Sequence, residues 1–260
     1  MKINITDFKM DYFSIKGKNA IVTGGNTGLG QAFSLALAKA GANILIPSVM
    51  PDDPEFNKLI EAEGVKVVYM EGDMTKPGVP KAIIDKCAET LGSVDILVNC
   101  AGICLIKPVL EFGRKEWDPM IAINLTAAFE MTHEAIQYMI PQKSGKVINI
   151  CSMLSYLGGQ WSPAYTASKA GIAGLTRTYA DELAQFNIQV NGIAPGYFKT
   201  KAAEFSMNDP ERNKKIMEHT PEGRWGDVHD LMGATVFLAS KASQFVNGSV
   251  LAVDGGYLMR

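Results

Sequence analysis

The sequence predicts an α/β protein with one doubly wound parallel sheet and helices on both faces. Short runs rich in β-branched residues alternate with longer amphipathic stretches, an order typical of βαβ units. The seven strands are expected near residues 20–23, 44–46, 66–71, 95–99, 146–151, 189–194 and 249–253. Because the 260 residues contain no linker, repeat or low-complexity tract, we expect a single domain, 1–260.

The first helix is predicted from about Leu29 to Ala40, where apolar residues recur every three or four positions. Directly before it, residues 23–30 read TGGNTGLG. Glycines let a backbone turn tightly beside a ligand, and a helix N-terminus offers N–H groups to a pyrophosphate. The spacing G-x-x-x-G-x-G differs from G-x-G-x-x-G, and a plain turn is the alternative. The strand before it and the helix after it favour a dinucleotide site.

The end of the second strand bears on cofactor choice. Folds that prefer NAD carry an acid there for the ribose 2′-hydroxyl, but this chain has Ser48 followed by Val49. No arginine stands there or in the glycine loop, where Thr27 is also uncharged. A serine can hydrogen-bond a ribose hydroxyl, whereas a 2′-phosphate would lack a counter-charge. We therefore expect NAD, with NADP less favoured.

Composition and charge argue against several other functions. A net charge of −2 gives no reason to expect a nucleic-acid or membrane partner, and residues 1–18 resemble neither a signal peptide nor an anchor. The four cysteines form no CxxC pair, and with only three histidines we expect no metal site. Reduced cysteines acting as small apolar fillers would suit a cytoplasmic protein.

Residues 165–169 read YTASK, inside an Ala-rich stretch with helical spacing. Positions four apart lie on one face of a helix, so Tyr165 and Lys169 should point the same way. Taken alone, the pair could be a solvated surface pair. Other motifs follow the same order along the chain: VNCAG at 98–102, Asn124 in a helical segment, Ser152 after the fifth strand, and PGYFKT at 195–200.

Together these motifs resemble the short-chain dehydrogenase/reductase family over essentially the whole chain. Cys100 replaces the second Asn of the family's NNAG, a departure that we expect to be tolerated. Stretches such as CSMLSYLGG and NIQVNGIAPGY resemble most closely the branch of 2-deoxy-D-gluconate 3-dehydrogenase, also described as 2-dehydro-3-deoxy-D-gluconate 5-dehydrogenase, and an uncharacterised bacterial oxidoreductase on that branch.

The resemblance implies a Rossmann fold and a role for each of four catalytic residues. Tyr165 would exchange a proton with the substrate oxygen while hydride moves to or from nicotinamide. Lys169 would lower the tyrosine pKa and bind the nicotinamide ribose, Ser152 would hydrogen-bond the reacting oxygen, and Asn124 would hold a water. Lowering a phenol pKa from about 10 to near 7 takes about 4 kcal/mol, which one cation about 4 Å away supplies at an effective dielectric of 20.

The resemblance also implies where the cofactor binds. By matching position, the residues expected around it are Gly24, Asn26, Thr27, Gly28, Leu29, Gly30, Ser48, Asp73, Met74, Asn99, Ala101, Gly102, Tyr165, Lys169, Pro195, Gly196, Phe198 and Thr200. Asp73 and Met74 would line the adenine pocket, and residues 195–200 would surround the nicotinamide. Asn99 is expected to brace the central strands more than to touch the cofactor.

The substrate is expected to be a small carbohydrate, with a gluconate-like sugar acid favoured. Sugar-acid members of the branch tend to carry arginines after the NAG motif and before the catalytic tyrosine. Here those segments hold only Lys107 as a cation, with Gln160 and Trp161 before Tyr165; with Ser152, these form the predicted substrate site.

Three alternatives stay open at this point. A neutral sugar or polyol could stack on Trp161, which could also merely pack a mobile lid. A 3-oxoacyl-thioester reductase would use the same four catalytic residues. A cofactor-binding protein without catalysis is disfavoured, because all four catalytic residues are present. Arg224 and Trp225 belong either to the packing of the substrate lobe or to the site.

Beyond the single domain, we expect an N-terminal extension at 1–17 and a substrate-lobe insertion at about 199–222. The C-terminal GYLMR is apolar yet lies beyond the last strand, so it would be exposed in a monomer. With the family resemblance, this predicts a homotetramer.

Overall fold

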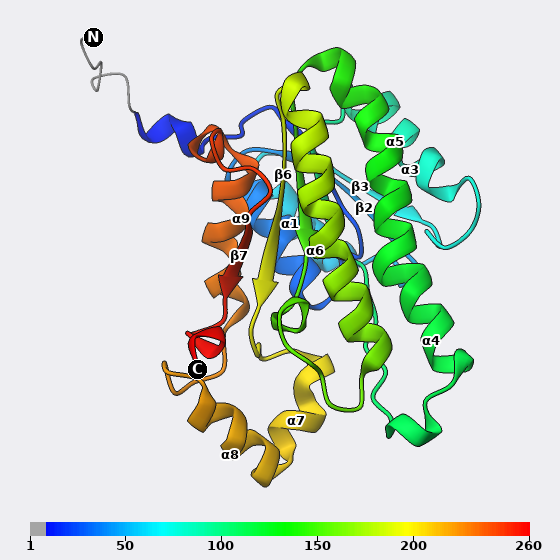
Figure 1. Cartoon of the computed structure of the whole chain (residues 1–260). Coiled ribbons are helices and arrows are strands. Elements are labelled where there is room, and N and C mark those ends of the chain that lie inside the picture. Colours follow the sequence, from blue (N-terminus) through cyan, green and yellow to red (C-terminus); the bar gives the residue numbers. More distant parts are fainter. Residues whose placement is uncertain (1–8) are drawn as a thin grey trace.

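The computed structural model describes residues 9–260 and confirms the predicted fold (Figure 1). A seven-stranded sheet has the order β3-β2-β1-β4-β5-β6-β7, and all neighbouring strands are parallel. The strands are β1 (Asn19–Val22), β2 (Asn43–Ser48), β3 (Val67–Glu71), β4 (Ile96–Asn99), β5 (Gly145–Ile150), β6 (Ile188–Pro195) and β7 (Val250–Val253). Each predicted strand is present, with its ends within two residues of the expected ones.

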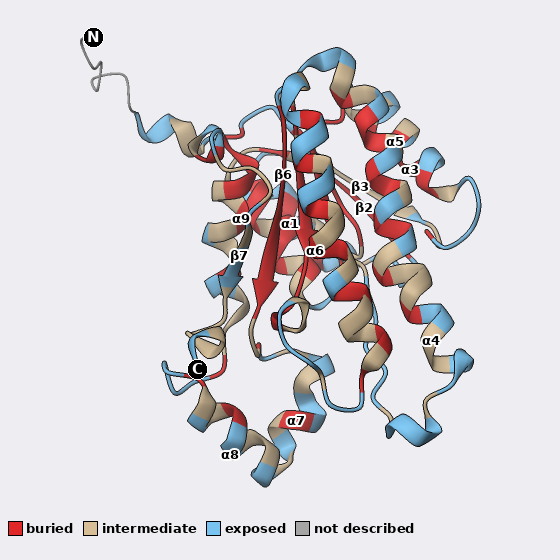
Figure 2. Ribbon diagram, viewed as in Figure 1, coloured by how far each residue is buried: buried red, intermediate tan, exposed pale blue. Residues whose placement is uncertain are grey.

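Helices cover both faces of this sheet. They are α1 (Gly28–Lys39), α2 (Pro54–Glu61), α3 (Val79–Leu91), α4 (Arg114–Ile121), α5 (Ala127–Gln142), α6 (Pro163–Leu183), α7 (Glu204–Asn208), α8 (Pro210–His219) and α9 (Met232–Ala239). Alternate residues of β1 enter different cores: Ala20 and Val22 join the cluster containing α1 and α9, whereas Ile21 joins that of α3 and α5. Figure 2 shows the central strands buried between these two layers.

The strand order reverses at β1 and β4, which are neighbours although β2 and β3 intervene in the sequence. Loops that leave such a pair diverge and form a crevice, the usual ligand site of open α/β sheets. Thr23 ties the two loops together at their base: its Oγ1 accepts hydrogen bonds from the N–H groups of Cys100 and Ala101, both at 2.9 Å. The glycine loop and the NCAG segment therefore meet at the carboxyl edge of the sheet.

The expected substrate-lobe segment, 199–222, contains a short turn η6 (Lys201–Ala203), α7 and α8, which lie beyond the carboxyl end of β6 (Figure 1). The expected N-terminal extension falls partly outside the described residues. Within it, Ile15 is buried and its N–H donates to the Ala40 carbonyl at 3.1 Å, so this end belongs to the domain. Between residues 9 and 260 no helix is long and apolar enough to span a membrane.

The cysteines are all free, as expected. Cys87 and Cys151 are buried, but Cys104 is exposed, so its expected role as a core filler is wrong. Across the described part of the chain, no cluster of three or more His, Cys, Asp or Glu side chains could hold a metal ion.

Candidate active site

Tyr165 and Lys169 lie in the first turns of α6 and share one face of it, as their spacing predicts. The Lys169 Nζ is 5.6 Å from the centre of the Tyr165 ring. The small residues around the pair let α6 pack closely on its neighbours: a Cβ at Gly171 would lie 3.0 Å from the Leu125 side chain. Ser168 is fully buried, and its hydroxyl donates to the Tyr165 carbonyl at 2.7 Å.

Asn124 lies in a π-helical turn, η3 (Ala122–Thr126), between α4 and α5. Such turns are frequent at functional sites. The Asn124 amide clamps the chain after the NCAG motif: Oδ1 accepts from the Ile103 N–H at 2.8 Å, and Nδ2 donates to the Ile103 carbonyl at 2.9 Å. Nδ2 also donates to the Ser168 hydroxyl at 3.2 Å, which joins this turn to α6. A Cβ at Gly102 would come within 2.9 Å of Oδ1, so glycine is required there.

Ser152 follows β5 and begins the short turn η4 (Met153–Ser155). Its hydroxyl oxygen accepts from the Leu154 N–H at 3.1 Å. The hydroxyl of Ser155 accepts from the Ser152 N–H and donates to the Lys169 carbonyl at 2.7 Å, which fixes the turn against α6. The four predicted catalytic residues are thus brought together from η3, η4 and α6.

Burial is the main influence on the pKa values of Tyr165 and Lys169. Burial raises the pKa of the Tyr165 phenol, while a hydrogen bond with the Ser152 hydroxyl acts in the opposite direction. Lys169 is 5% exposed, and burial lowers the pKa of its ammonium, which donates to the Ile150 carbonyl at 2.6 Å. Burial is the largest influence on the pKa of the phenol, and the lowering of that pKa by Lys169 stays a prediction.

The glycine loop fits a pyrophosphate. Its start is tied to β2, since the Gly24 N–H donates to the Pro47 carbonyl at 2.8 Å. Gly24 and Gly28 have φ of +64° and +52°, values that other residues rarely adopt. A Cβ at Gly30 would lie 2.1 Å from the Gly24 oxygen, whereas nothing comes within 4 Å of one at Gly28. The N-terminus of α1 therefore opens onto a space that a side chain would fill. Thr27 and Leu29 flank that opening.

At the end of β2, Ser48 is buried and its oxygen accepts from the Met50 N–H at 3.1 Å. Its own O–H is left to donate to a ribose hydroxyl. Asn26 reaches from the glycine loop to the same segment, where Nδ2 donates to the Pro51 carbonyl at 2.8 Å. Its Oδ1 is buried without a partner. These contacts hold the two loops at a fixed spacing.

The expected adenine residues, Asp73 and Met74, follow the end of β3. Asp73 accepts hydrogen bonds from the N–H and hydroxyl of Thr75, which lower the pKa of its carboxyl group. Met74 shares a small cavity, of about 10 Å³, with Asn99 and Ala101. The Asn99 amide donates to the Asn149 side chain at 2.8 Å, so it braces β4 against β5.

The segment after β6 lies on the other side of the crevice. Pro195 ends β6, and a Cβ at Gly196 would lie 2.6 Å from the Asp254 backbone. The ring of Phe198 is buried in the core, where it packs against Gly226. Thr200 precedes the turn η6.

The two segments expected to contact substrate lie side by side, because the Lys107 N–H donates to the Trp161 carbonyl at 2.9 Å. Lys107 is already paired: its Nζ is 3.0 Å from the Glu116 carboxylate. Gln160 is exposed, and Trp161 is 40% exposed with φ of +65°. Such a φ is an outlier for a bulky residue.

Sequence reasoning missed Arg212, in the lobe segment that carried no assigned residue. Its guanidinium lies 5.8 Å from the centre of the Trp161 ring. Nothing in the local pattern PERNKK distinguishes this arginine from the surface cations beside it. Only the packing of α8 over residue 161 brings it to the site.

Arg224 and Trp225 pack the lobe. Trp225 is buried and its Nε1 donates to the Asn213 side chain at 2.8 Å, while Arg224 pairs with Asp230 at 2.6 Å and Glu222 at 2.9 Å.

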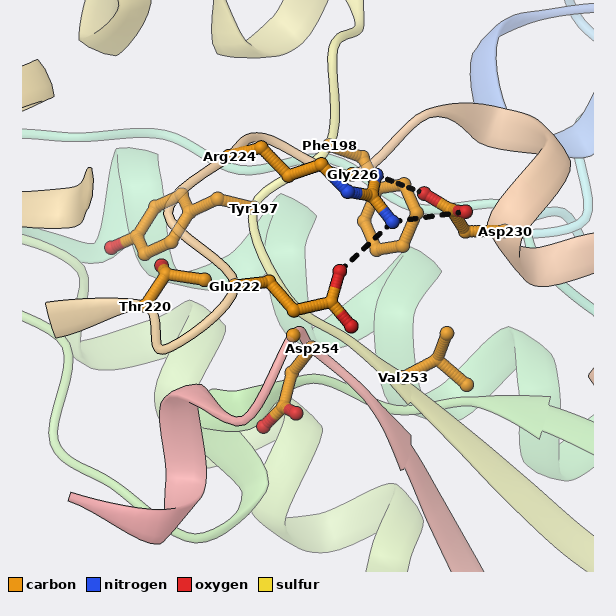
Figure 3. Close-up of a pocket in the computed structure, with 10 residues that line it drawn as sticks. Tyr197, Phe198, Thr220, Glu222, Arg224, Gly226, Asp230, Val253 and Asp254 are labelled. Carbon is orange, nitrogen blue, oxygen red and sulfur yellow. Dashed lines mark hydrogen bonds and ion pairs between the residues drawn. The ribbon is translucent and has the colours of Figure 1, made fainter.

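Figure 3 shows these charges around a cavity of about 230 Å³. Its lining also includes the residues Tyr197, Phe198, Thr220, Gly226, Val253, Asp254 and Gly255. None of the four catalytic residues lines it, so this cavity is separate from the reaction site.

With this geometry, the chain can be placed in its class. A family model described as enoyl-(acyl carrier protein) reductase matches residues 24–258. The chain belongs to the short-chain dehydrogenase/reductase family, as expected, and is an oxidoreductase.

Individual relatives resemble it along nearly their whole length. It is 61% identical to the uncharacterized oxidoreductase YgcW of Escherichia coli strain K12, over 99% of this chain and 98% of the relative. It is 46% identical to the 2-dehydro-3-deoxy-D-gluconate 5-dehydrogenase of Bacillus subtilis strain 168, over 96% of this chain and 98% of the relative. The crystal structure of a gluconate 5-dehydrogenase from Burkholderia cenocepacia, in complex with NADP and tartrate, matches with a TM-score of 0.90 and 35% identity, over 96% of this chain and 98% of that one.

Proposed function

We propose that the protein interconverts a hydroxyl and a carbonyl on a small, gluconate-like sugar acid, using NAD(P), as part of carbohydrate metabolism. One observation carries the proposal: Asn124, Ser152, Tyr165 and Lys169 meet at the edge of the sheet onto which the glycine loop opens. Relatives named as gluconate and keto-deoxygluconate dehydrogenases support the substrate class.

The protein's own residues supply the proton chemistry. In the reducing direction Tyr165 gives its phenolic proton to the substrate oxygen, and burial of the phenol keeps that proton in place until substrate arrives. Ser152 donates a hydrogen bond to the same oxygen. NAD(P), when bound, takes or supplies the hydride. The phenolate left on Tyr165 faces the Lys169 ammonium, which stabilises it. In the oxidising direction Tyr165 receives the proton instead.

The glycine loop, Ser48, Asp73 and Met74 would hold the adenosine and pyrophosphate, and Lys169 and residues 195–200 the nicotinamide half. A water held by Asn124 would relay protons to Lys169. We infer a preference for NAD, because Ser48 and the two residues after it carry no cation for a 2′-phosphate. The Burkholderia relative was crystallised with NADP, so both cofactors belong in the assay.

A neutral polyol is the second candidate substrate, because Lys107 is paired with Glu116 and Trp161 presents an exposed ring. In that case Trp161 and Gln160 would dominate substrate binding. A 3-oxoacyl thioester is the third candidate substrate, because its reduction needs the same four catalytic residues.

We further propose a cytoplasmic homotetramer. The four free cysteines suit a reducing compartment. β7 is one of the two edge strands, with Leu251 39% exposed on it, and Met259 in the final turn is 84% exposed. A neighbouring subunit would cover these apolar groups. A 28 kDa particle in light scattering at micromolar concentration would rule this assembly out.

The test of the function is an oxidoreduction assay over sugar acids, sugars and polyols, with NAD and NADP. We expect the highest kcat/KM with a sugar acid. Turnover of 3-oxoacyl thioesters alone, or of none of these compounds, would overturn the proposal.

A further inference from the structure

Arg212, in α8, carries a charge that the protein itself leaves unpaired. Its Nε is buried without a hydrogen-bond partner, and within residues 9–260 no carboxylate lies at ion-pair distance from its guanidinium. Arg224, the next arginine along the chain, is by contrast paired, with the carboxylates of Asp230 and Glu222. The residue as a whole is half-buried, but a buried guanidinium N–H without an acceptor is costly, and a carboxylate is its strongest partner.

The guanidinium lies near two aromatic rings, Trp161 before α6 and Phe205 in α7. Its central carbon is 5.8 Å from the centre of the Trp161 ring and 5.9 Å from that of Phe205. Aromatic contacts hold a guanidinium by its face and leave N–H groups at its edge free to donate. Trp161 has φ of +65°, and backbone outliers of this kind cluster at ligand sites.

Arg212 borders the same space as the catalytic tyrosine. Trp161 is followed by Ser162, whose hydroxyl oxygen is 3.6 Å from the Cys104 Sγ. Burial raises the pKa of the Cys104 thiol, the positive charge of Arg212 acts against this rise, and the same thiol raises the pKa of the Tyr165 phenol. Arg212 and Tyr165 therefore both lie near the Cys104 side chain.

The position of Arg212 is fixed by the start of α8. Asp209 caps this helix, and its Oδ1 accepts from the Arg212 N–H at 3.0 Å. The next residue, Asn213, accepts the Nε1–H of buried Trp225 at 2.8 Å. The helix is thus anchored on both sides of the arginine, so its side chain starts from a rigid element.

We propose that Arg212 binds the carboxylate of the substrate and so selects sugar acids over neutral sugars. The proposal rests on the function proposed above. The guanidinium donates two parallel N–H bonds to the two carboxylate oxygens, while the carbon that reacts lies at Tyr165. Lys107, the cation expected from the sequence, is neutralised by Glu116 and is not required for this contact.

The test compares D-gluconate with D-glucitol, which carries CH₂OH in place of the carboxylate. For Arg212→Ala we expect KM for D-gluconate to rise about tenfold to hundredfold, with kcat changed only a few-fold. Arg212→Lys should recover part of the affinity. Lys214→Ala is the matched control, because it removes the same charge from the exposed face of the same helix. Unchanged KM in Arg212→Ala, or an equal rise in Lys214→Ala, would overturn the proposal.

A binding measurement separates this proposal from the proposed function. Tyr165→Phe with NAD should bind D-gluconate without turning it over, and calorimetry should show the affinity falling at least tenfold when Arg212→Ala is added. If the unmodified enzyme oxidises D-gluconate and the affinity does not depend on Arg212, the function stands and the inference fails. If it binds D-gluconate through Arg212 but turns over no compound of the panel, the inference stands and the function fails. Absence of D-gluconate binding overturns the inference and leaves the function to the panel assay.

Discussion

The crevice and the lobe of this enzyme satisfy their polar groups in different ways. In the crevice, Thr23, Asn99 and Asn124 are buried, and each is hydrogen-bonded to backbone or side chains of neighbouring strands and helices. At the lobe, the rings of Trp161, before α6, and Phe205, in α7, are exposed, and the Arg212 guanidinium lacks a polar partner among the described residues. Among the described residues, the atoms left without a partner in the crevice, Asn26 Oδ1 and Asn99 Oδ1, belong to neutral amides, whereas the one in the lobe, Arg212 Nε, belongs to a charged group. The difference suggests that chemistry resides in the first and selectivity in the second.

The largest expected effect belongs to the chemistry. Tyr165→Phe should lower kcat about 10²–10⁴-fold, because the phenol is the proposed proton donor, while the Kd for the dinucleotide changes only a few-fold. Steady-state kinetics and a cofactor fluorescence titration measure the two quantities. Retention of more than about a tenth of the activity would show that Tyr165 has been misassigned.

The next effect tests how tightly the crevice is built. In Gly30→Ala the new Cβ would lie 2.1 Å from a backbone oxygen, so the glycine loop must shift and the Kd for the dinucleotide should rise about tenfold or more. Gly233→Ala, in α9, is the control because nothing lies within 4 Å of its Cβ position. It should leave binding unchanged and stabilise the fold by about 0.4–1 kcal/mol in a thermal or denaturant titration. Equal cofactor affinity in both variants would contradict the proposed cradle.

A smaller change is expected at the adenosine end. Ser48→Asp should raise the ratio of kcat/KM for NAD to that for NADP about tenfold, since a carboxylate accepts from both ribose hydroxyls and repels a 2′-phosphate. The two values are measured with one substrate at saturation. An unchanged ratio would mean that residue 48 does not face the ribose.

The smallest effect sharpens the contrast within the lobe. Lys107→Ala should change KM for a sugar acid less than about threefold, because its ammonium is partly exposed and paired with Glu116, and such pairs contribute about 0–1 kcal/mol. Trp161→Ala should cost more, about 1–3 kcal/mol, since it removes the ring beneath Arg212. A tenfold rise in KM for Lys107→Ala alone would return the carboxylate contact to Lys107.

The sequence by itself determined the fold class, the seven strands and the family. These features are encoded locally, by hydrophobic periodicity, by glycines that the backbone needs, and by a tyrosine and a lysine one helical turn apart. It also indicated that Asn99 would act as a brace, because a polar residue at the end of a buried strand must find partners inside the sheet.

Only the tertiary structure decided which charges are free. Lys107 and Arg212 look alike in the sequence, but Glu116 neutralises the first, and the packing of α8 over Trp161 shields the second. The direction of the Tyr165 pKa shift also depends on the tertiary structure, because burial of the phenol is its largest cause. Pairing and desolvation depend on which distant segments meet, and no local pattern records that.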